Sequence, residues 1–273
     1  MVKLEPIFEL IKLALLSGYL KGERPLSLLL SAPVEAGKTE SIRLFRQNSG
    51  ILYIADFTPT GFVRAYSREI KSGAIKHILV PDLLSALSRD YYSRERFITF
   101  LNSLTEEGLA TIHTMFVNLE VRAPHPIGLI GGVTKEKLEQ SKVNWLKVGF
   151  LSRMLPVTWR YNRTTVREVL EYIFRRRYTG EKPIFCRFPS NQVEVFIPPK
   201  LARMLEHLAD KLLASYKAAA TSPEDVYGFR YQRHFQRLAM ASALEAGRHV
   251  VSREDVDRVK ELSIFCNLDF TTI

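Results

Sequence analysis

A lysine and a threonine near the N-terminus stand in a pattern that can bind a nucleotide phosphate. The stretch SAPVEAGKTES, residues 31–41, almost matches the phosphate-binding loop G-x-x-x-x-G-K-[ST], with Ala32 in place of the first glycine. In such a loop, backbone N–H groups surround the phosphate, while the lysine and the hydroxyl reach the terminal phosphates and Mg²⁺. We therefore expect Lys38 and Thr39 to bind ATP and Mg²⁺, the alternative being a chance match at the start of an ordinary helix. The expected loop comprises Ala32, Pro33, Val34, Glu35, Ala36, Gly37, Lys38, Thr39 and Glu40.

A nucleotide site of this kind also needs an acid at the end of a neighbouring buried strand. Asp82 ends the apolar stretch HILVPD and is expected to bind Mg²⁺, unless it only starts the next helix. The next position, where ATPases of this kind carry a water-activating glutamate, is Leu83. Because leucine cannot accept a proton, either another carboxylate serves or hydrolysis is slow. Asp56 is the nearest candidate by topology, although a turn or N-cap role fits it equally well.

The elements expected around these residues form an α/β fold. Apolar runs at 25–32, 51–56 and 75–82 alternate with helical segments, which is typical of a parallel sheet between helices. Residues 109–124 instead alternate between apolar and polar side chains, which predicts two short strands with a turn near Val117–Asn118. We expect an α/β core over residues 1–162. A mainly helical lid should cover residues 163–273, with an extended insert at about 182–199.

The composition indicates which kind of partner and which cellular compartment to expect. The 39 basic and 29 acidic residues give a net charge of +10, which favours an acidic partner such as nucleic acid over a plain basic surface. No apolar run is long enough for a membrane span, and residues 1–23 read as an amphipathic helix, not a signal peptide. The two cysteines, Cys186 and Cys266, lack histidines at metal spacing, which predicts a reducing cytoplasmic setting and no zinc site.

The order of these features resembles the AAA+ ATPases, and more narrowly the motor domain of minichromosome maintenance (MCM) helicases. After the phosphate loop and Asp82, residues 108–134 (GLATIHTMFVNLEVRAPHPIGLIGGVT) resemble the family's β-hairpin and sensor 1 strand. Residues 149–159 (GFLSRMLPVTW) resemble its Leu-Ser-Arg-Phe stretch, and residues 229–256 resemble its lid. The resemblance implies an AAA+ P-loop core, a hairpin before sensor 1 and a C-terminal helical lid.

The resemblance also implies roles for three further residues. Thr134 falls at the polar sensor 1 position, and Arg153 at the arginine that reaches a neighbouring subunit's ATP. Arg230 falls at the sensor 2 arginine, with Arg233 and Arg237 as rivals on nearby turns. The alternatives are a helix-capping arginine for Arg153 and a solvated basic helix for Arg230.

The resemblance covers the motor region alone, without the family's oligonucleotide-binding or winged-helix domains. The hairpin predicted in this chain lacks an obvious lysine at its tip. Phe116 lies there instead and could stack on a base, pack against a neighbouring subunit or belong to the core. The first hypothesis is therefore a homo-oligomeric ATPase, a hexameric ring or a helical filament, that acts on DNA as a helicase or loader. The second is an ATP-dependent scaffold or remodeller with slow hydrolysis and a protein partner. A small-molecule kinase is disfavoured by the hairpin and the helical C-terminal third.

Overall fold

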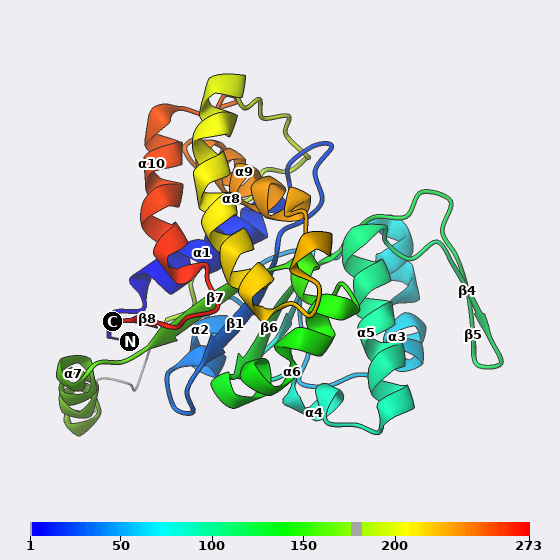
Figure 1. The fold of residues 1–273 in the computed structure, drawn as a ribbon. Helices are drawn as coiled ribbons and strands as arrows, with labels where there is room; N and C mark the ends of the chain where they lie inside the picture. Colours follow the sequence, from blue (N-terminus) through cyan, green and yellow to red (C-terminus); the bar gives the residue numbers. More distant parts are fainter. Residues whose placement is uncertain (1, 176–181) are drawn as a thin grey trace.

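The protein is built around a six-stranded parallel sheet with the strand order β2-β3-β6-β1-β7-β8. A computed structural model describes residues 2–175 and 182–273 (Figure 1). The sheet strands are β1 (Ser27–Ala32), β2 (Ile51–Tyr53), β3 (His77–Val80), β6 (Gly128–Thr134), β7 (Met154–Arg160) and β8 (Thr271–Thr272). A separate antiparallel hairpin consists of β4 (Thr111–Thr114) and β5 (Val117–Glu120). The expected parallel sheet and hairpin are confirmed.

Helices cover the sheet and form a bundle in the C-terminal third, as the sequence predicted. Helix α1 packs against α9, and α8 and α10 also pack on α9. Figure 1 shows these four helices grouped together, away from α3, α4 and α5. The helices are α1 (Glu5–Ser17), α2 (Lys38–Arg43), α3 (Pro59–Ser72), α4 (Leu84–Leu87), α5 (Tyr91–Glu106), α6 (Lys135–Lys147), α7 (Arg163–Phe174), α8 (Pro199–Ala219), α9 (Phe229–Glu245) and α10 (Arg253–Leu262). In the described part of the chain, no helix has the length and apolar character needed to cross a membrane.

Local sequence signals explain where several elements begin and end. Every residue of β1 is buried, because this central strand is covered on both faces, and its apolar run reflects that burial. Helix α10 begins with a capping box, SRED in the sequence, in which Ser252 and Asp255 satisfy each other's backbone N–H groups. Helix α3 ends at Gly73, whose φ of 65° is open to glycine at little cost. Of these elements, β1 ends at Ala32, where the predicted phosphate loop begins.

Three local expectations were wrong in detail. The hairpin turn lies at Met115–Phe116, two residues before the predicted position, so Val117 is buried in β5 and is not part of the turn. The short helix that the stretch SREIKSG predicts at residues 67–73 is longer in the structure: α3 starts at Pro59, because Thr58 accepts a hydrogen bond from the N–H of Gly61 as an N-cap. Strand β8 was not anticipated, because two residues carry no periodic signal.

The first residue of β3 is a buried histidine. The His77 ring is fully buried, and its Nε2 lies 3.2 Å from the carbonyl oxygen of Leu26. A Cβ atom on Gly128 would lie 2.2 Å from a ring carbon, so only glycine fits beside this ring. Burial lowers the pKa of His77 from 6.5 to about 4, which keeps the imidazole neutral.

We predict that His77 makes the fold sensitive to acid. The unfolded chain binds a proton near pH 6.5 and the folded chain only near pH 4, so stability falls as the pH drops through that interval. The loss attributable to His77 is about 3 kcal/mol. His77→Gln should reduce the fall in the free energy of unfolding, measured with urea at pH 7, 5.5 and 4.5. The exposed His113→Gln is the control, and equal pH profiles for His77→Gln and the original protein would contradict the prediction.

Candidate functional site

The predicted phosphate loop leaves the C-terminal end of β1 and enters α2. Ala32 still belongs to the strand, where it pairs with Thr134 of β6, and it is not among the residues with positive φ. A glycine is therefore not required at this first position of the motif. Further along the loop, Glu35 and Gly37 adopt φ values of 65° and 82°. Left-handed residues within a loop turn successive N–H groups toward one side, which is the geometry of an anion-binding concavity.

The side chain of Lys38 lies across this loop. Its Nζ donates hydrogen bonds to the carbonyl oxygens of Ala32 and Pro33, at 2.7 and 2.8 Å. Burial lowers the pKa of Lys38, whereas the charges of Asp82 and Glu136 act to raise it. Both carboxylates therefore lie within electrostatic reach of the ammonium group.

The residues expected to hold Mg²⁺ suit a cation that also binds phosphate. Thr39 is exposed in the first turn of α2. Asp82 follows β3, and its Oδ1 accepts a hydrogen bond from the N–H of Leu84 at 2.8 Å. Among the described residues, no group of three or more histidine, cysteine or acidic side chains could hold a metal alone. A hydroxyl and one carboxylate instead match Mg²⁺, which keeps several waters and uses substrate phosphates as ligands.

Two aromatic residues, Trp159 in β7 and Tyr161 directly after it, hold the phosphate loop through hydrogen bonds. The indole Nε1 of Trp159 and the hydroxyl of Tyr161 both donate to the carbonyl oxygen of Ala36, at 3.0 and 3.2 Å. Trp159 is fully buried, so this contact attaches the loop to the core. The sequence signal, WRY at the end of a strand, did not single these residues out.

Thr134 ends β6 beside the phosphate loop, because its strand partner is Ala32. Its Oγ1 accepts a hydrogen bond from the N–H of Lys137 at 3.2 Å and so caps α6. A threonine hydroxyl that accepts one bond still has a proton to donate. Thr134 can therefore cap the helix and present a donor at the same edge as Lys38.

A water-activating carboxylate cannot take the place of Leu83 without disturbing the core. Its side chain is fully buried and packs on Gly131, where an added Cβ would come within 2.3 Å of a Leu83 methyl group. Its backbone N–H donates to the carbonyl oxygen of Gly132 at 2.8 Å. The side chain thus points into the protein, which explains why leucine stands at this position.

Asp56, the carboxylate considered as a substitute, is engaged elsewhere. Its oxygens accept hydrogen bonds from Arg89 at 2.7 Å and from Ser85 at 2.9 Å. Burial acts to raise the pKa of Asp56, but the bonds from Ser85 and Arg89 outweigh it and hold the pKa low. These contacts favour a structural role that links the segment after β2 to α4. Glu136, which is exposed and within reach of Lys38, was not singled out from the sequence.

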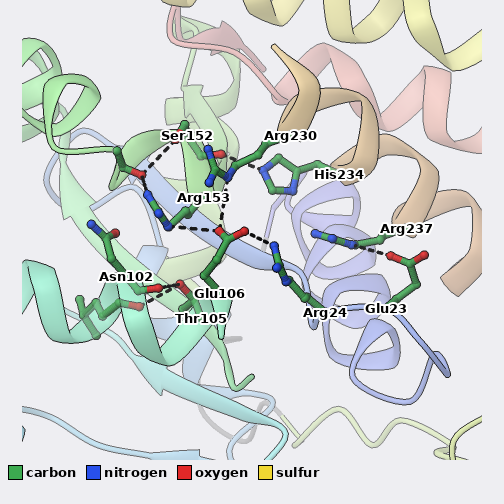
Figure 2. A network of polar contacts seen from close by, with 12 residues as sticks. Glu23, Arg24, Asn102, Thr105, Glu106, Ser152, Arg153, Arg230, His234 and Arg237 are labelled. Carbon is green, nitrogen blue, oxygen red and sulfur yellow. Dashed lines mark hydrogen bonds and ion pairs between the residues drawn. The ribbon is translucent and has the colours of Figure 1, made fainter. Parts of the chain in front are cut away.

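A second polar cluster brings together two of the predicted arginines (Figure 2). Glu106 at the end of α5 forms ion pairs with Arg24, with Arg153 at 3.2 Å and with Arg230 at 3.3 Å. These arginines come from three separate elements: the turn before β1, the 3₁₀ turn Leu151–Arg153, and α9. Arg153 Nη1 also donates to the carbonyl oxygen of Gly149 at 2.7 Å. Glu106 therefore holds Arg153 and Arg230 side by side.

The remaining arginines of α9 are held by a second glutamate. Glu23 forms ion pairs with Arg233 and, at 3.1 Å, with Arg237. His234 beside them is buried, and burial together with the charge of Arg237 lowers its pKa to about 3, so it adds no charge. A cavity of about 560 Å³ is lined by five arginines but only two glutamates, so an excess of positive charge surrounds it. An anion would be attracted there.

The arginine cluster and the phosphate loop lie at opposite edges of the sheet, the arginines where β1 and β7 begin and the loop where β1 ends. Arg153 directly precedes β7, whose first residue, Met154, pairs with Ser27 at the start of β1. The phosphate loop instead follows Ala32 at the end of β1. A strand of six residues spans about 20 Å. Arg153 and its partner Arg230 thus cannot reach Lys38 of the same chain.

Comparison with known proteins gives a likeness of structure without a likeness of sequence. No protein-family model matches the chain, and no curated protein matches it in sequence. The fold matches 278 solved chains. One is a full-length MCM homolog from Methanopyrus kandleri, with a TM-score of 0.53 and 15% identity over 97% of this chain.

The protein has an AAA+ fold, similar to that of this MCM homolog. The chain spans 56% of the length of the Methanopyrus kandleri protein, so the likeness concerns that part only. At 15% identity the AAA+ fold is the shared property, and the activity has to be argued from the residues described above.

We predict that Leu83→Glu destabilises the AAA+ fold and does not raise ATP turnover. The variant would place a carboxylate among buried apolar groups without a partner, at a cost of about 3 kcal/mol in the free energy of unfolding. Leu83→Met, which conserves volume, should cost less than about 1.5 kcal/mol. Urea unfolding and an ATPase assay on both variants test this. Faster hydrolysis by a stable Leu83→Glu protein would contradict it.

Proposed function

We propose that the protein is an ATP-binding AAA+ motor whose copies assemble head to tail. The supporting observation is the separation of the phosphate loop and the arginine cluster across the full length of β1. Each protomer then offers a triphosphate cradle at one edge and its counter-charges at the other, so a complete site requires two copies. A contact between two different faces repeats from copy to copy, which produces a ring when it closes and a helical filament when it does not.

Each residue near the proposed interface has a role that follows from charge and position. Lys38 binds the β- and γ-phosphates, and Thr39 and Asp82 bind Mg²⁺ directly or through its water shell. Arg153 and Arg230 of the next copy neutralise charge on the γ-phosphate. Electrostatic stabilisation by an arginine supplied from a second protein raises turnover by about 10³–10⁵-fold in other NTPases.

The first candidate activity of this motor is action on DNA, as a helicase or loader. The formal charge of +10 favours a polyanion. The hairpin extends away from the sheet in Figure 1, and its turn residues Met115 and Phe116 are exposed by 87% and 67%. An exposed aromatic side chain can stack on a base. The fold is also that of an MCM homolog.

We predict that ATP drives assembly and that Arg153 is needed for turnover but not for binding. Size-exclusion chromatography should show larger species with ATP than with ADP or no nucleotide. Arg153→Ala should bind ATP normally but lower turnover by about 10³-fold, because the lost charge acts on the transition state. Lys38→Ala should lose ATP binding itself. The exposed Arg64→Ala of α3 is the control. The proposal would be contradicted if the protein stayed monomeric in ATP and Arg153→Ala left its turnover unchanged.

The second candidate function is a nucleotide-dependent scaffold or protein remodeller. It is favoured by the inward-facing Leu83 and by the engagement of Asp56 with Arg89, which leave the site without the usual water-activating glutamate. In this case ATP binding sets assembly, hydrolysis is slow, and a protein partner performs the downstream activity.

DNA stimulation of ATP hydrolysis distinguishes the two functions. For a DNA motor we expect single- or double-stranded DNA to raise the ATPase rate about tenfold or more, because DNA engagement and turnover are coupled. Phe116→Ala should reduce that stimulation, with Phe185→Ala as a matched control, because Phe185 is similarly exposed and belongs neither to the hairpin nor to the phosphate loop. An unchanged rate at all DNA concentrations would favour the scaffold.

A further inference from the structure

Helix α7 carries an apolar stripe that no other part of the described chain covers. Figure 1 shows α7 standing away from the body of the protein. The stripe consists of residues spaced by four, three and one, which share one face of a helix. They are Val166, Leu170, Ile173 and Phe174, with exposed fractions of 43, 59, 49 and 84%. A continuous exposed apolar face of this kind is typical of a contact surface.

A second apolar surface surrounds a cavity of about 550 Å³ between the C-terminal end of α6 and the start of α9. We call it the aromatic cavity, because the rings of Tyr227 and Phe229 stack at its rim with centroids 5.8 Å apart. Both rings are more than two-thirds exposed, and Val143 beside them is 45% exposed. The cavity is wide enough for one or two large side chains of a helix.

Each of these surfaces is attached to one half of the proposed ATP site. Helix α7 begins two residues after Tyr161, whose hydroxyl donates to the carbonyl oxygen of Ala36 in the phosphate loop. At the other edge of the sheet, Ser152 and Arg230 line the aromatic cavity, and Ser152 is the neighbour of Arg153. Bringing the arginines of one copy to the phosphate loop of another thus also brings the aromatic cavity close to α7.

We propose that α7 of one copy docks in the aromatic cavity of the next copy, with Leu170 and Phe174 as the inserted side chains. The inference rests on the head-to-tail assembly proposed above. The occupant is a second copy of this chain, because α7 and the cavity lie at opposite edges of a sheet about 20 Å across and cannot meet within one protomer. Insertion of an amphipathic helix into an apolar groove is a common mode of recognition.

Charges around the two surfaces are compatible with this contact. Arg167 lies on α7 one turn before Leu170, and Asp225 lines the aromatic cavity with Glu224 next to it. Opposite charges at the rim of an apolar contact favour one register of docking over others. The contact uses different faces on the two copies, so it propagates with the ATP site and reinforces it.

Cross-linking between two cysteine variants tests the contact directly. Proteins carrying Phe174→Cys and Phe229→Cys are mixed with ATP and treated with a short bismaleimide. The native thiols should give little background, since burial raises the pKa of Cys186 to about 11 and also raises that of Cys266. We expect a cross-linked dimer from this mixture in ATP. None is expected from the matched mixture of Phe174→Cys with Met115→Cys, whose cysteine lies on the hairpin.

Assembly of surface variants provides the second measurement. Leu170→Ser and Phe174→Ser should raise the protein concentration needed for assembly in ATP about tenfold or more, while ATP binding by each protomer is retained. Arg167→Glu should weaken assembly less, and Lys200→Ser on α8 is the neutral control. If the original protein assembles in ATP but the α7 variants assemble equally and no cross-link forms, the docking proposal is overturned and head-to-tail assembly stands. If the original protein does not assemble at all, both proposals fail.

Discussion

The hydrogen-bonded position of β1 between β6 and β7 is the constraint on which the rest of the structure depends. This strand is buried on both faces and pairs in parallel with both neighbours, so it cannot slip without breaking two ladders. Its end fixes the phosphate loop beside Thr134, and its start fixes Met154 and hence Arg153 at the opposite edge. One strand thus keeps the cradle and the counter-charges of the proposed ATP site apart within each protomer.

Much of the core was predictable because its signals are local. An apolar run followed by Gly37, Lys38 and Thr39 predicts a strand and a phosphate loop, and the capping box at Ser252 predicts the start of a helix. Residues that act across long sequence distances gave no such signal. Glu106 meets Arg24 and Arg230, and Trp159 meets Ala36, only because the folded sheet brings distant segments together. Likewise the hairpin turn was misplaced, because adjacent residues there differ little in turn propensity.

The two glycines before Val133 show how packing and chemistry constrain each other at this site. Gly131 leaves room for the Leu83 side chain, and a Cβ on Gly132 would lie 2.3 Å from the carbonyl oxygen of Pro81. The segment after β3 therefore lies directly on β6, and its apolar side chain fills the space that the glycines leave. This packing stabilises the turn that presents Asp82, but it places at the adjacent position a leucine, Leu83, which cannot accept a proton.

Strand β8 has a mechanical consequence for the C-terminal helices. After α10 the chain returns to β7, where the N–H of Ile273 donates to the carbonyl oxygen of Arg160 at 2.9 Å. The N–H of Asn162 in turn donates to the carbonyl oxygen of Ile273 at 2.8 Å. The segment that contains α7 to α10 thus leaves the sheet and rejoins it at the same point, next to Tyr161 and its contact with Ala36. The C-terminal end of the chain and the phosphate loop therefore share one anchoring point at the end of β7, so a substitution that weakens the pairing of β8 would also loosen the support of the loop.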